Sequence, residues 1–139
     1  MTEENLEFFK KMQVAGNLAA DALDEVTKFV VPGKTTNFLD KICYEYIRDH
    51  GGYSAPLYYK GFPKSCCTST NHIVCHGIPS EKVLKDGDIM NVDVTAFIDE
   101  HHGDTGRMFC IGDVSVKSKN LVSATYESMM KAISIIKPG

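Results

Sequence analysis

The sequence predicts an α+β domain in which helices cover an antiparallel sheet. Apolar residues recur every three or four positions near both ends of the chain, which is typical of amphipathic helices. Between them, residues 89–98 alternate between apolar and polar, which predicts a strand, and an apolar segment at 108–111 predicts the strand that returns beside it. A chain of 139 residues, 43% hydrophobic and 24% charged, is long enough for one such domain, and this composition excludes a disordered protein.

The first predicted helix covers residues 6–31 and has one apolar face. It must end before Pro32, because proline disfavours helical geometry in the residue that precedes it. The side chains on the apolar face are Leu6, Phe9, Met12, Ala15, Ala19, Ala22, Val26 and Phe29.

Two further helices are predicted. The polar residues at 35–37 offer side-chain oxygens for the N-cap of a second helix, which ends at Gly51. Its apolar face carries Leu39, Ile42, Cys43, Tyr46 and Ile47. Helical spacing returns at 121–136 and predicts a third helix that ends before Pro138.

The middle of the chain carries the strands. In the clearest strand, Met90, Val92, Val94, Ala96 and Ile98 alternate with Asn91, Asp93, Thr95 and Phe97. Residues 100–103 are polar and predict the turn before the strand at 108–111. Residues 53–88 are predicted to be irregular, with a short strand at 73–75 and a turn at 85–88.

The charge pattern argues against nucleic-acid and membrane partners. The chain has 15 Lys and Arg against 18 Asp and Glu, so it lacks the basic excess that a phosphate backbone requires. It contains no run of 18 apolar residues, and its acidic start does not resemble a secretory signal, so we expect a cytoplasmic protein.

The five cysteines are odd in number and include an adjacent pair, which favours reduced thiols over a disulfide framework.

Asp93 is the most informative residue for chemistry. It stands between Asn91 and Thr95 on the polar face of the strand, where a buried carboxylate needs a partner or a cation. Asp104 follows eleven residues later, and two carboxylates on one hairpin suit a divalent metal ion. The alternative is a solvent-exposed strand face and an aspartate in a turn.

The hairpin register decides whether these carboxylates meet. A tight turn at 98–99 would set Asp93 opposite Asp104. The composition instead favours a turn centred near Glu100, which sets Asp93 opposite residue 107 or 108. In that register a wider loop or a bulge would have to reorient Asp104.

His76 lies in the segment CHGIP at 75–79, where glycine and proline restrict the loop. An imidazole held there can donate or accept a proton near neutral pH, and the alternative is a hydrogen-bonded loop histidine. The neighbouring Cys66, Cys67, His72 and Cys75 leave open a zinc site or a Cys–His nucleophile, although the paired spacing of structural zinc sites is lacking.

An aromatic and thiol group precedes this loop and consists of Tyr58, Tyr59, Phe62 and Cys67. These residues suit either an ordinary core or the wall of a pocket for an apolar side chain.

A short sequence similarity relates the ends of the first and last predicted helices, because FVVPG at 29–33 resembles IIKPG at 135–139. The similarity suggests that a second, related half once began at residue 139 and is absent.

Several motifs, taken together in their order along the chain, resemble those of the methionine aminopeptidases of the bacterial type I class. The resemblance covers essentially all 139 residues. The segments that carry it are MQVAG at 12–16, GFPKS at 61–65, NHIVCHGIP at 71–79, DGDIMNVDVT at 86–95 and HGDT at 102–105.

The resemblance implies a pita-bread fold with two pseudo-symmetric α+β halves around a two-metal site, and an enzyme that removes the initiator methionine. It implies that Asp93 and Asp104 are metal ligands and that His76 contacts the scissile peptide. It further implies that Tyr59, Phe62 and Cys67 line the pocket for the methionine side chain.

Residues 1–139 correspond to the N-terminal half of such a catalytic domain. One histidine and two glutamates of the family's ligand set have no counterpart here, so we expect weak or incomplete binding of the metal ions, normally two of Co, Mn, Fe or Zn, and an inactive isolated chain. We expect N-terminal methionine peptides of nascent proteins as substrates, association with the ribosome, and self-association of this half where the complete enzyme is a monomer. The alternative function is a non-catalytic protein- or peptide-binding module of the same fold.

Overall fold

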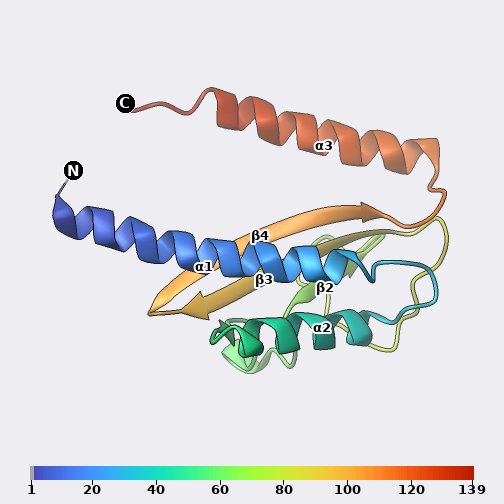
Figure 1. Cartoon of the computed structure of the whole chain (residues 1–139). Helices are drawn as coiled ribbons and strands as arrows, with labels where there is room; N and C mark the ends of the chain where they lie inside the picture. Colours follow the sequence, from blue (N-terminus) through green and yellow to red (C-terminus); the bar gives the residue numbers. More distant parts are fainter. Residues whose placement is uncertain (1) are drawn as a thin grey trace.

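The computed structural model describes residues 2–139 and contains three helices and a four-stranded antiparallel sheet (Figure 1). The helices are α1 (Glu3–Thr27), α2 (Thr36–Asp49) and α3 (Val116–Ser134), with a short 3-10 turn at Tyr59–Gly61. The strands are β1 (Tyr53–Ser54), β2 (Cys67–Thr70), β3 (Ile89–Ile98) and β4 (His101–Cys110). The predicted α+β class with an antiparallel sheet is confirmed.

β3 is the central strand of the sheet. β4 pairs along its whole length on one side, while β1 and β2 pair with its end and its beginning on the other side. Asp99 and Glu100 connect β3 to β4, and both have positive φ, 49° and 64°, as a type I′ hairpin turn requires. The expectation of a turn over residues 100–103 is therefore wrong, because the two-residue turn lets β4 begin at His101.

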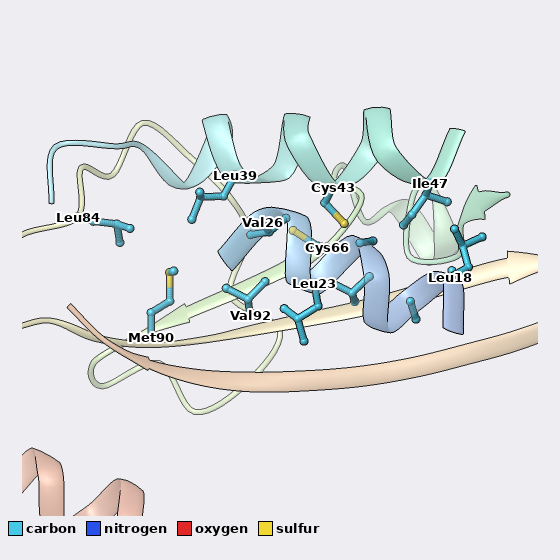
Figure 2. Close-up of a cluster of buried hydrophobic side chains, with 14 of the residues drawn as sticks. Leu18, Leu23, Val26, Leu39, Cys43, Ile47, Cys66, Leu84, Met90 and Val92 are labelled. Atoms are coloured by element: carbon cyan, nitrogen blue, oxygen red, sulfur yellow. The ribbon is translucent and has the colours of Figure 1, made fainter. Parts of the chain in front are cut away.

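The alternating pattern of β3 is confirmed by burial. Met90, Val92, Val94 and Ala96 are completely buried, and they face the helices. Figure 2 shows α1 and α2 side by side over this face, with Leu23 and Val26 of α1 and Leu39, Cys43 and Ile47 of α2 packed between the helices and the strands. One face of the sheet is thus sealed by apolar side chains.

Only the second part of α1 takes part in this core. Ala15, Ala19, Ala22 and Val26 are buried as predicted, whereas the earlier positions of the same apolar face, Leu6, Phe9 and Met12, are exposed. The hairpin lies close against α1 at Gly103, where an added Cβ would lie 2.0 Å from the carbonyl oxygen of Ala15. The helix also ends at Thr27, four residues before the predicted end.

The predicted N-cap of the second helix is confirmed, because the Thr35 side chain accepts a hydrogen bond from the backbone N–H of Phe38 at 3.1 Å. The predicted turn at 85–88 is also present, closed by a hydrogen bond from Asp88 N–H to the carbonyl oxygen of Lys85 at 3.1 Å. Local sequence signals therefore placed both features correctly.

The predicted strand at 73–75 is wrong. The strand of this region is β2, at Cys67–Thr70. All four of its residues are buried, and its sequence CTST lacks the alternation of apolar and polar residues that predicts a strand. Pairing with β3 stops at Asn71, which has a positive φ of 55° and whose Oδ1 accepts the N–H of Ile89 at 3.0 Å. The side chain thus replaces the next bond of the ladder, and the chain turns away before residue 73.

The third predicted helix is present as α3. Figure 1 shows it set apart from α1 and α2, beyond β4, and within the described chain none of its residues is buried. Its exposed apolar side chains include Leu121, Met129, Met130 and Ile133. No helix within residues 2–139 is long and apolar enough to span a membrane.

Candidate functional site

The sheet face opposite the helices brings the two candidate metal ligands together. Asp93 of β3 pairs with Gly106 of β4, and Thr95 pairs with Asp104. Directly paired residues point to the same face, and that face repeats every second residue. Asp93 and Asp104 are therefore diagonal neighbours on one face, with the glycine leaving space beside Asp93.

Neither predicted register is correct. The turn lies at 99–100, between the two positions considered, and it places Asp104 two residues along from the partner of Asp93. No bulge is needed, since the diagonal of a regular ladder already brings the two carboxylates near each other. The turn sequence Asp99-Glu100 has no glycine or asparagine, so the usual signal for a two-residue hairpin is missing.

The two carboxylates interact electrostatically. Partial burial raises the pKa of Asp93 above its ordinary value, and the negative charge of Asp104 and a side-chain hydrogen bond with it raise this pKa further. His76 acts in the opposite direction and lowers it. The pair therefore favours a proton or a cation between the carboxylates.

A pocket of about 810 Å³ opens beside this pair. Its lining includes the predicted residues Asp93, Asp104, His76, Tyr59, Phe62 and Cys67. Tyr58, which belonged to the same predicted aromatic group, is not part of the lining and is 75% exposed. The pocket joins a wall of aromatic and apolar side chains to a polar centre of two carboxylates and an imidazole.

Cys67 stands where these two parts meet, directly paired with Asp93. Burial raises the pKa of its thiol to about 11, and the nearby carboxylate of Asp93 adds to the effect. The side chain is therefore a neutral thiol at neutral pH. This state suits an apolar pocket wall and disfavours the Cys–His nucleophile.

Backbone hydrogen bonds at the edge of β2 hold His76 in place. Its neighbour Gly77 accepts from Thr68 N–H at 2.8 Å and donates to Ser69 Oγ at 3.1 Å. A Cβ on Gly77 would lie 2.3 Å from the carbonyl oxygen of Thr68, so only glycine permits this approach. His76 itself has a positive φ of 53°, a strained conformation of the kind that clusters at functional sites.

The aromatic wall is also built on unusual backbone. Tyr58 and Lys60 have positive φ values of 67° and 47°, and Tyr58 N–H donates to the carbonyl oxygen of Phe62 at 2.7 Å. This tight loop turns Tyr59 and Phe62 into the pocket lining.

Sequence reasoning missed several lining residues. Lys60, Ile78, Thr95 and His102 contribute to the pocket. Thr95 and His102 lie on the same sheet face as Asp93, because His102 pairs with Phe97. Strand alternation combined with the correct turn would have found both, whereas nothing local marks Lys60 or Ile78.

The loose cysteine and histidine cluster is not one site. Cys66 is fully buried in the core beside Cys43, and hydrogen bonding with Cys43 together with burial raises the pKa of its thiol. Cys67, the next residue, faces the pocket, since neighbours in extended chain point to opposite sides. Among residues 2–139, no group of three or more His, Cys, Asp or Glu side chains is arranged to hold a metal ion.

The carboxylates of Asp93 and Asp104 are nevertheless the type of ligand that divalent cations prefer. Asp93 and Asp104 offer the carboxylate oxygens that such ions prefer. Their mutual repulsion is relieved by a positive charge between them. Two carboxylates fall short in number of the ligands that fix a metal's geometry.

Comparison with known proteins supports a peptidase ancestry. A methionine aminopeptidase of Rickettsia prowazekii is 54% identical over 131 residues, which cover 94% of this chain and 51% of that relative. Methionine aminopeptidase 2 of Mycobacterium tuberculosis is 54% identical over 133 residues, covering 96% of this chain and 47% of the relative. The chain thus spans about half the length of the curated relatives it matches.

The fold agrees with the sequence comparison. The crystal structure of methionine aminopeptidase from Rickettsia prowazekii superposes with a TM-score of 0.93 at 52% identity, covering 100% of this chain and 55% of that one. The predicted half of a pita-bread fold is therefore confirmed. Residues 10–139 match the model of metallopeptidase family M24. The chain belongs to this family.

Proposed function

We propose that this chain is the N-terminal half of a methionine aminopeptidase catalytic domain, which hydrolyses the first peptide bond of proteins that begin with methionine. The observation that carries the proposal is the diagonal pair Asp93 and Asp104 beside an apolar pocket that also contains His76. The substrates are nascent chains in the cytoplasm, some of them met at the ribosome.

The pocket wall recognises the methionine side chain. Tyr59 and Phe62 supply aromatic surface, which suits a polarisable thioether. Cys67 contributes a neutral thiol, since its pKa is raised to about 11.

Asp93 and Asp104 are the residues that would hold a divalent cation, one of Co, Mn, Fe or Zn. When bound, such a cation polarises a carbonyl oxygen and lowers the pKa of a coordinated water. His76 lies on the same pocket, where its imidazole can hydrogen-bond the scissile peptide. Two carboxylates bind the cation weakly, so the chain alone lacks appreciable activity.

We expect the remaining ligands to come from the part of the curated relatives that this chain does not match, since the chain spans about half of their length. The exposed apolar side chains of α3 favour association with another subunit or with that half. Without it, we expect self-association of the 139-residue chain.

Methionine release tests the proposal. The chain is incubated with Mn²⁺ and the peptide Met-Ala-Ser, with and without the C-terminal half of the Rickettsia prowazekii relative. We expect release only from the mixture, and loss of that release with Asp93→Asn or Asp104→Asn. Asp99→Asn, an exposed turn aspartate of the same hairpin, is the matched control that retains release.

Two outcomes contradict the proposal. Release that survives Asp93→Asn would show that the carboxylate pair is not the reacting centre. A chain that binds peptides without any dependence on metal or on Asp93, and never releases methionine, would instead identify the non-catalytic binding module.

A further inference from the structure

Asp40 is a buried carboxylate on α2 that lies outside the pocket. Its side chain is 12% exposed, and its Oδ1 accepts hydrogen bonds from the backbone N–H of Ser65 at 2.7 Å and of Cys66 at 3.2 Å. The Ser65 hydroxyl is 2.7 Å from the same oxygen, and Lys64 Nζ is 3.9 Å from Oδ2. The Asp40 carboxylate therefore accepts hydrogen bonds from Ser65 and Cys66 and forms an ion pair with Lys64.

Such an arrangement selects one backbone conformation. Burying a carboxylate is costly unless hydrogen bonds replace its water. The N–H groups of Ser65 and Cys66 can converge on a single oxygen only when the segment 64–66 is bent toward α2. Any other course of this segment would leave Asp40 buried without its donors.

This segment lies between two parts of the pocket wall. Phe62 and Pro63 line the pocket immediately before it, and Cys67 lines the pocket immediately after it. Asp40 itself is not among the lining residues. The hydrogen bonds of Asp40 therefore connect the helical layer to the wall on both sides of the segment without contacting the pocket.

We propose that Asp40 is a positioning residue for the methionine side-chain pocket, which acts by holding residues 64–66 so that both Phe62 and Cys67 line the binding space. This inference rests on the proposed function, because it assumes that the pocket accepts a methionine side chain. It adds a specificity-determining residue that does not contact the substrate.

Side-chain selectivity tests the inference on the 139-residue chain. Binding of Met-Ala-Ser and Ala-Ala-Ser is measured by NMR titration of the wild type and Asp40→Asn, a variant of almost the same size. We expect Asp40→Asn to bind Met-Ala-Ser about tenfold more weakly, corresponding to one hydrogen bond to a charged group, with little change for Ala-Ala-Ser. Asp24→Asn is the matched control, since Asp24 is an exposed carboxylate that accepts from Arg107 at 2.7 Å away from the pocket.

Ser65→Ala keeps the test decisive if Asp40→Asn does not fold. It removes the hydroxyl donor and retains both backbone donors, so we expect a smaller loss of selectivity in the same direction. Amide hydrogen exchange at Ser65 and Cys66 should accelerate in both variants.

The outcomes separate this inference from the proposed function. A wild type with no preference for methionine over alanine would overturn the proposed pocket and this inference with it. A wild-type preference that Asp40→Asn and Ser65→Ala both retain would overturn the role of Asp40 alone, leaving the pocket in place and Asp40 a contributor to stability only.

Discussion

The two faces of β3 differ in burial and in the type of side chain that they carry. Met90, Val92 and Val94 are completely buried under α1 and α2, whereas Asp93 and Thr95 are half-buried on the face that opens to the pocket. Alternate side chains of one strand therefore belong to the core and to the pocket in turn. Substitutions one residue apart in β3 should therefore change different properties, the free energy of unfolding on the buried face and metal binding on the pocket face.

Truncation on the buried face should have the largest effect. Met90→Ala removes a fully buried side chain and leaves a cavity, so we expect the free energy of unfolding to fall by about 2–5 kcal/mol. Thr95→Ala on the pocket face should change it by less than about 0.5 kcal/mol. Urea denaturation followed by circular dichroism measures both, and equal losses would refute the division between the faces.

Two glycines of β4 repeat the comparison on the neighbouring strand. Gly103 pairs with Ala96 on the helix side, and an added Cβ would lie 2.0 Å from the backbone of Ala15. Gly103→Ala should therefore destabilise the fold by about 1–3 kcal/mol. Gly106 pairs with Asp93 on the other face of the sheet, where the nearest atom to an added Cβ is the Val92 carbonyl oxygen at 3.5 Å, so Gly106→Ala should be nearly neutral in thermal denaturation. A neutral Gly103→Ala would argue against the close contact between the hairpin and α1.

Stabilisation by a metal ion should depend on the carboxylates of the pocket face alone. Mn²⁺ at ten times its dissociation constant should stabilise the wild type by about 1.4 kcal/mol, since it binds only the folded state. Asp93→Asn and Asp104→Asn should lose this gain, while Asp99→Asn keeps it. Differential scanning fluorimetry with and without EDTA measures the shift, and an equal gain in all variants would place the ion elsewhere.

The dependence of stability on pH should be smaller and of opposite sign at two aspartates of this region. The pKa of Asp93 is raised from 3.8, first by burial and then by Asp104, so its ionisation destabilises the fold above the raised value. This cost disappears as pH falls through the raised pKa to below 3.8. Asp93→Asn should accordingly be more stable than the wild type at pH 7 and no more stable near pH 3.

Asp88, just before β3, supplies the contrast. Desolvation acts to raise its pKa, but hydrogen bonds from the Asn71 side chain and Lys85 N–H outweigh it and lower the pKa below 3.8. Its stabilising contribution is complete above 3.8 and is lost as pH falls through the lowered value. Asp88→Asn should therefore be less stable than the wild type at pH 7. Parallel pH profiles for the two variants would contradict the assigned causes.

Local patterns predicted much of the fold. The alternation of β3, the N-cap at Thr35 and the existence of three helices all follow from spacing or from a residue's own hydrogen-bonding groups. The same reasoning failed for β2, whose CTST sequence has no apolar alternation, and for residues 73–75, where the apolar side chains lie in a loop. A short edge strand is defined by its partner rather than by its own sequence.

The candidate site divides in the same way. Asp93, Asp104 and His76 stood out in the sequence as residue types that suit a metal and a peptide, and they lie around one pocket. Their convergence depends on the turn at Asp99 and on the docking of Gly77 against β2, neither of which has a decisive local signal.

The amino-acid order alone therefore established the α+β class, the two-sided character of β3 and the chemistry available to the chain, because periodicity and side-chain chemistry are local properties. The hairpin register, the separation of Cys66 from Cys67 and the hydrogen bonds of Asp40 with Ser65 and Cys66 became visible only in the folded chain. The bonds of Asp40 join residues 25 and 26 positions apart in sequence, while the register and the facing of the two cysteines depend on how the strands pair and pack against the rest of the molecule.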